Sequence, residues 1–423
     1  MAVAQTGNRA DESPYLKRIA ELENRGTPLQ LAAGLGNLGA MYFNGGRYAD
    51  AERTYLRALA SVERQPGTPV ELGTALNNIG AVSAVLGKFR EAELYYYRAL
   101  EVRKATLGEA HPETVATIGN LAALYRTLGR DAEAEPLCRR ALELRLLSSG
   151  PESNETAAAK NNLGSVCTGL GRYAEAERLF LEALATRERL LGADHPEVAV
   201  LLNNLGQLYH AQGRSARAEA AHRRALAVRE KMLAPDAEET AISLNNLAAV
   251  IEARGHVEEA ERMYRRALAI HQRTLGASHP ETAVQWSNLA HLAYSRRQYR
   301  EAESLYRKAL GIWEKALGPE HPRVAGAAQN LAVTYVEMKQ YELAAPLFER
   351  ALGIWEKDPN SAALAVSALR NYAALMKRSG HKKEASQLEA RASAIREKRP
   401  EAMRASAVVD VLDLQAAAIY PPR

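Results

Sequence analysis

The chain has 423 residues, of which 25% are charged and 6% aromatic, and a net charge of +5 at pH 7. This composition is typical of a mostly helical protein with few or no strands, and the small, dispersed surplus of charge argues against a nucleic-acid-binding domain. Two cysteines are too few for a disulfide framework or a zinc site. No apolar run is long enough for a membrane span or an intact signal peptide, so a cytoplasmic location is expected, with export after trimming before Met1 as the alternative.

Three regions are expected along the chain. Residues 1–27 form an N-terminal segment with a short capping helix over residues 13–25, opened by Ser13-Pro14. Residues 28–397 carry an internal repeat, and residues 398–423 form a C-terminal tail. The tail contains an apolar stretch, Val408 to Leu414, for which a folded-back cap and a loose end both stay open.

The repeat is marked by an Asn that is followed, in eight of nine cases, by an aliphatic and then a small residue. It recurs every 41 or 42 residues at Asn37, Asn78, Asn120, Asn162, Asn204, Asn246, Asn288, Asn330 and Asn371. Small residues stand 2, 14 and 21 positions after each Asn, as at Ala122, Ala134 and Ala141. So regular a period predicts nine stacked helix-turn-helix units of about 42 residues, each burying its apolar face against its neighbours. The small residues predict close helix packing.

Turn signals separate the helices of each unit. Nine positions after the Asn stands a Gly, the usual left-handed helix stop, except where Arg297 and Lys339 replace it. The next unit opens with His-Pro at four places, beginning with His111. Because each of these histidines lies in a separate loop, we predict no metal site.

These motifs resemble the tetratricopeptide repeat (TPR) family, in particular its longer-period branch typified by kinesin light chains. The resemblance rests on the runs Ala134–Leu142 and Tyr95–Leu100 and on the Leu-Gly-x-x-His-Pro hinges, and it covers residues 28–397. It implies an all-α superhelix, a TPR solenoid, whose first helices line a concave groove. It also implies a non-catalytic scaffold or adaptor that binds peptide segments of partner proteins in that groove.

In the family register, the groove is lined by the repeated Asn, the residue before it, and residues three, six and seven positions after it. The predicted peptide-binding residues are Asn120, Arg126, Asn161, Asn162, Asn203, Asn204, Gln207, His210, Asn245, Asn246, Asn288, His291 and Tyr294. A side-chain amide both donates and accepts hydrogen bonds, which suits binding of an extended backbone. In the alternative interpretation, each Asn bonds a neighbouring repeat and never meets a ligand.

Other functions have weaker support in the sequence. Gly34–Gly39 matches a dinucleotide fingerprint but aligns with the interior of a first helix, so no cofactor is expected. No P-loop, HExxH or GxSxG occurs, and an active site in the groove would have to use His210, Glu252 and His291. We therefore predict no catalytic residues, no nucleic acid and no membrane partner. A solenoid that associates with copies of itself is the alternative.

Overall fold

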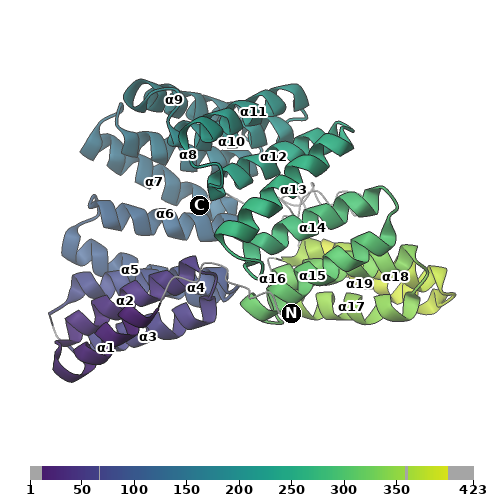
Figure 1. Cartoon of the computed structure of the whole chain (residues 1–423), viewed down its shortest axis with the longest axis horizontal. Coiled ribbons are helices and arrows are strands. Elements are labelled where there is room, and N and C mark those ends of the chain that lie inside the picture. The colour runs from purple at the N-terminus through teal and green to yellow at the C-terminus, as the bar shows by residue number, and fades with distance from the viewer. Residues whose placement is uncertain (1–11, 66, 358–360, 399–423) are drawn as a thin grey trace, which may run out of the picture. The chain divides into compact units, whose positions relative to one another are not determined.

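The computed structural model describes residues 12–65, 67–357 and 361–398. These residues form nineteen α-helices and no strand, which confirms the all-α TPR-solenoid class (Figure 1). The first helix is α1 (Ser13–Arg25), which packs on α2 (Pro28–Asn44). The apolar stretch Val408 to Leu414 lies outside the described residues.

The described helices fall into two compact units, residues 12–208 and 209–398, which divide near the end of α10. The first unit holds α1, α2 (Pro28–Asn44), α3 (Tyr48–Glu63), α4 (Pro69–Val85), α5 (Phe89–Leu107), α6 (Pro112–Thr127), α7 (Asp131–Ser149), α8 (Asn154–Gly169), α9 (Tyr173–Leu191) and most of α10 (Pro196–Ala211). The second holds α11 (Ser215–Met232), α12 (Glu238–Ala253), α13 (Val257–Thr274), α14 (Pro280–Ser295), α15 (Tyr299–Leu317), α16 (Pro322–Glu337), α17 (Tyr341–Trp355), α18 (Ala362–Arg378) and α19 (Lys382–Lys398).

Within each unit, packing follows the chain. The two helices of a pair pack together, as α4 does with α5, and the second helix then packs on the first helix of the next pair, as α5 does on α6. First helices of successive pairs also touch, as α4 and α6 do. Each pair therefore buries its apolar surface against its neighbours in the sequence, which is the organisation of a solenoid.

The turn residues act as helix caps and stops. The Nδ1 atoms of His111 and His279 accept hydrogen bonds from the backbone N–H two residues later, at 3.3 and 3.1 Å. The His-Pro histidines therefore satisfy a backbone donor that has no partner within the helix. At the helix stops, Arg297 and Lys339 both adopt a φ of 61°, the left-handed conformation that the other repeats give to Gly.

The small residues of the repeat lie under large rings. A Cβ atom on Gly80 would lie 2.7 Å from the ring of Tyr96, and one on Gly164 would lie 2.9 Å from the ring of Phe180. Real Cβ atoms do not approach a ring so closely. The rings of Tyr96 and Phe180 therefore fit only because the residue opposite each of them is Gly. Ala176, fourteen positions after its Asn, is likewise fully buried.

The cysteines, the segment Gly34–Gly39 and two tryptophans all lie within the helical packing. Cys138 and Cys167 are buried free thiols. The segment Gly34–Gly39 lies inside α2, where it cannot form the turn between strand and helix that binds a dinucleotide. Trp313 and Trp355 are buried, and the Trp313 indole donates a 3.0 Å hydrogen bond to the carbonyl of Pro280.

Acid should destabilise the second unit through His222. This residue stands at the repeat position that Tyr96 and Phe180 occupy in their repeats, and it is 1% exposed. Burial, followed by the charges of His210 and Arg229, lowers the pKa of His222 to about 3. Because the unfolded chain takes up this proton near pH 6.5, the stability due to the neutral ring is lost as pH falls from 6.5 toward 3. The loss attributable to His222 should reach about 2 kcal/mol between pH 7 and pH 5.

We expect His222→Phe, which reproduces the residue at Phe180 and Phe348, to remove this part of the loss. Urea unfolding of both proteins at pH 7 and pH 5 measures the effect as a difference of differences, so any change in packing that is the same at both pH values cancels. An equal loss in both proteins would contradict the assignment.

Candidate functional site

First helices are open to solvent along one stripe. On α12, away from its ends, the residues that are not buried are Ile242, Asn245, Asn246, Ala249 and Glu252. Their spacing of three or four residues places them on one side of the helix. Apart from Ile242, these are the register positions predicted for peptide contact.

The same stripe recurs on other first helices. On α6 it comprises Ala116, Gly119, Asn120, Ala123 and Arg126. We call these solvent-facing stripes of α4, α6, α8 and α10 in the first unit, and of α12 and α14 in the second, the ladder face.

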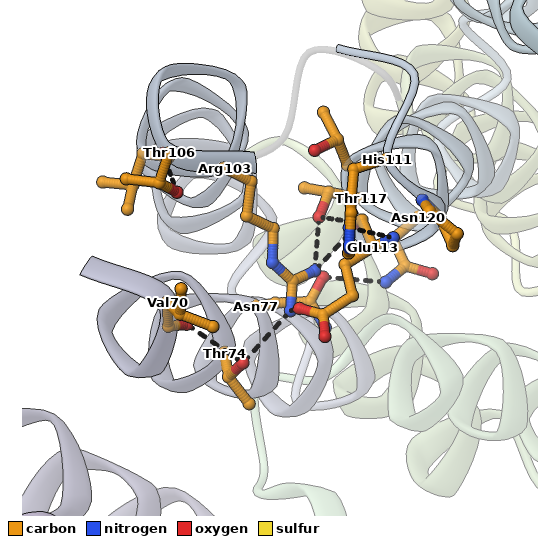
Figure 2. Close-up of polar contacts among 12 residues, drawn as sticks. Val70, Thr74, Asn77, Arg103, Thr106, His111, Glu113, Thr117 and Asn120 are labelled. Carbon is orange, nitrogen blue, oxygen red and sulfur yellow. Dashed lines mark hydrogen bonds and ion pairs between the residues drawn. The ribbon is translucent and has the colours of Figure 1, made fainter. Parts of the chain in front are cut away.

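Amide pairs link first helices along the ladder face. Asn120 Nδ2 donates to Asn77 Oδ1 at 2.9 Å, a bond between α6 and α4 that is visible in Figure 2, and Asn204 Nδ2 donates to Asn161 Oδ1 at 2.7 Å. Asn288 donates to Asn245 in the same way. Successive pairs are 84 residues apart, so this bond recurs at every second repeat.

The predicted residues differ in accessibility. Three are buried: Asn203, Asn204 and Asn288, at 2, 3 and 6% exposure. The others are half-buried or exposed: Asn120, Arg126, Asn161, Asn162, Gln207, His210, Asn245, Asn246, His291 and Tyr294. A ligand can therefore reach only some of the amides, while the buried amides tie the helices together.

Arg126 is the cation of the ladder face on α6. Its Nε lies 3.8 Å from Asp131 Oδ1, too far for a hydrogen bond, and its side chain is 26% exposed. Within the described parts of the chain the guanidinium has no hydrogen-bond partner. Burial raises the pKa of Asp131 to about 6, against the opposing effect of Arg126. The pair is therefore loose, and the available donors of Arg126 are its terminal nitrogens, since Nε is buried.

Glu252 is the carboxylate of the ladder face on α12. Tyr264 OH donates to its Oε2 at 3.1 Å, and its Oε1 lies 3.5 Å from His291 Nε2 on α14. The side chain is 9% exposed, and burial, opposed by the Tyr264 hydrogen bond, raises the pKa of Glu252 to about 7. Burial also lowers the pKa of His291. At neutral pH the imidazole is largely uncharged and does not neutralise this carboxylate.

Comparison with protein families agrees with this geometry. Tetratricopeptide repeat models match residues 31–64, 71–146, 155–231, 239–312, 284–357 and 327–398. The chain belongs to the tetratricopeptide repeat family. No curated protein matches it.

Several solved structures are similar to this TPR chain. BtubC (BKLC) from P. vanneervenii is 30% identical, over 55% of this chain and 92% of that one, with a TM-score of 0.42. A putative kinesin light chain of Podosopora anserina with nearly identical TPR-like repeats is 22% identical, over 50% of this chain and 99% of that one, with a TM-score of 0.40. Rap protein complexed with Competence and Sporulation Factor is 14% identical over 82% and 99%, with a TM-score of 0.52, which shows similarity of fold alone.

Buried arginines, which were not predicted from the sequence, join successive TPR repeats. Arg103 of α5 is 5% exposed and donates to the carbonyl of Glu113 at 3.1 Å and to Thr117 Oγ1 at 2.7 Å, both on α6 (Figure 2). Arg187 and Arg229 donate to the equivalent carbonyls at 3.2 and 2.6 Å. Each stands 25 positions after a repeat Asn, a spacing that could have revealed the set.

The three residues considered for an active site do not form one constellation. Glu252 and His291 meet, whereas His210 acts electrostatically on His222. Across the described ranges, no three His, Cys, Asp or Glu side chains gather as a metal site would require. Nor is any helix in those ranges long and apolar enough to cross a membrane.

Proposed function

We propose that this TPR protein is a non-catalytic scaffold that binds peptide segments of partner proteins along the ladder face. The observation that supports this most directly is that α4, α6 and α8 in the first unit and α12 in the second each carry accessible amides at the register positions predicted for peptide contact. Carboxamides can donate to and accept from the backbone of an extended peptide without selecting its sequence.

The small residues of the ladder face also leave space for the backbone of a bound peptide. A Cβ atom on Gly119 would meet nothing within 4 Å, so packing does not require Gly there. A Gly inside a helix costs about 1 kcal/mol relative to Ala. Together with Ala116 and Ala123, it leaves the α6 stripe low enough for a peptide backbone to approach the amide of Asn120.

In the first unit, Arg126 gives the face a preference for acidic groups. Its terminal nitrogens have no hydrogen-bond partner among the described residues, and its buried Nε makes only a loose contact with Asp131. A carboxylate of the peptide would form a charge-assisted hydrogen bond there. Since the side chain is partly exposed, binding of an acidic peptide should weaken as salt is added.

Two accessible amides test the proposal. Asn162 is exposed and Asn246 half-buried, and neither bonds an amide of a neighbouring repeat within the described residues. We expect Asn162→Ala with Asn246→Ala, which removes one amide from each unit, to weaken capture of a random decapeptide library by each unit about threefold, since one lost hydrogen bond contributes about 0.5–1.5 kcal/mol. Helicity and melting should be unchanged.

The matched control is Gln387→Ala, which removes an exposed amide from a second helix, α19. Undiminished capture by the double variant, with the control also unchanged, would remove the ladder face from the mechanism. Light scattering of the same proteins addresses self-association: a mass that rises with concentration in wild type but not in the double variant would assign the face to copies of this chain instead.

A further inference from the structure

Glu252 differs from the other acidic side chains of its neighbourhood because it has no cationic partner. Glu258 and Glu261 on α13 both pair with Arg296, at 3.1 and 2.6 Å. Among the described residues, no Lys or Arg forms an ion pair with Glu252. Its contacts are a tyrosine hydroxyl and an imidazole whose lowered pKa keeps it neutral.

An unpaired carboxylate in this position is costly to the folded protein. The Glu252 side chain is nine-tenths buried, and burying an ionised carboxylate without a partner is so unfavourable that the pKa of Glu252 rises to about 7 and the group is partly protonated at neutral pH. Tyr306, fully buried nearby on α15, has a hydroxyl with no hydrogen-bond partner in the described parts of the chain. The cluster therefore contains polar groups that its own residues leave unsatisfied.

The open side of the cluster is the ladder face. Ala249 precedes Glu252 by three residues on the same stripe of α12 and is half-buried, and Ala253, the last residue of the helix, is exposed. Their methyl groups are too short to block an approach to the carboxylate from solvent. His291, 19% exposed, marks the edge of the cluster on α14.

We propose that Glu252 is the specificity-determining subsite of the second unit and binds a Lys or Arg side chain of the bound peptide. A cation there would supply the missing partner of a desolvated carboxylate, which is a stronger interaction than the same pair in water. The inference rests on the proposed function, because it concerns a residue of the peptide that the ladder face holds. It gives the second unit a preference opposite in sign to that of Arg126 in the first.

A random hexapeptide library with capped termini tests this on the full chain. Wild type should capture a pool enriched in Lys or Arg at one position. Glu252→Gln, which retains an acceptor for Tyr264 and the shape of the side chain, should reduce that enrichment at least fivefold. The matched control Glu258→Gln removes a 79% exposed carboxylate from α13 and should leave the enrichment unchanged.

A second variant protects the test against misfolding of Glu252→Gln. Ala249→Arg places a cation three residues before Glu252 on the same solvent-facing stripe, a spacing at which two helical side chains meet, so it should abolish the enrichment by occupying the carboxylate. For one selected peptide, replacing its basic residue by norleucine should weaken wild-type binding about tenfold and Glu252→Gln binding little.

The outcomes separate the two proposals. Capture of peptides with no basic enrichment, or enrichment that survives in both variants, overturns the role of Glu252 while leaving the scaffold function intact. Failure of wild type to capture any peptide overturns the scaffold function itself.

Discussion

Arg103→Met is expected to lower the free energy of unfolding of the surrounding repeats by about 2–4 kcal/mol, because a buried guanidinium that bonds two helices is lost. Arg103 donates to the Glu113 carbonyl and to Thr117 on α6, and to Thr74 Oγ1 on α4 at 3.3 Å. Met fills a similar volume but leaves the carbonyl without this donor. The expected loss is smaller than that of a fully buried ion pair because the Glu113 side chain is 46% exposed.

The control for Arg103→Met is Arg98→Met on the same helix. Arg98 is 46% exposed and pairs with Glu63 at 3.2 Å, so its loss should change stability by less than about 1 kcal/mol. Repeats can open separately, so amide hydrogen exchange of α5 and α6 is the appropriate measurement. Equal protection in the two variants would show that the buried arginines do not hold neighbouring repeats together.

Ala176→Leu is expected to destabilise its repeat by about 1–3 kcal/mol or more, through overpacking. Ala176 on α9 is fully buried, at the position where every repeat has Ala. Three further heavy atoms can fit only if α8 and α9 move apart, which would also disturb the contacts of Phe180 with Gly164. Thermal melting followed by circular dichroism would measure the loss.

Ala185→Leu provides the same chemical change on the exposed side of α9. It should alter stability by no more than about 0.5 kcal/mol, since the added atoms lie in solvent. Similar melting temperatures for the two variants would place Ala176 outside the close helix contact and would contradict the register.

The sequence alone was sufficient for the architecture, because each repeat obeys the same local and nearest-neighbour packing rules. The Asn period predicted the helix pairs, the Gly positions predicted the left-handed stops, and Arg297 and Lys339 adopt the same conformation as the Gly that they replace. A pattern that recurs nine times makes each position comparable with its equivalents, so a single exception did not obscure the rule.

The tertiary structure decided which of these equivalent residues are available for binding. In sequence Asn162 and Asn204 occupy the same position, yet Asn204 is buried and bonded to Asn161, while the residue facing Asn162 in the preceding repeat is Gly119, which has no amide. Likewise, only the contacts of Glu252 show that it lacks a cation. Burial and charge pairing depend on side chains about 40 residues apart meeting across helices, and no periodicity within one repeat contains that information.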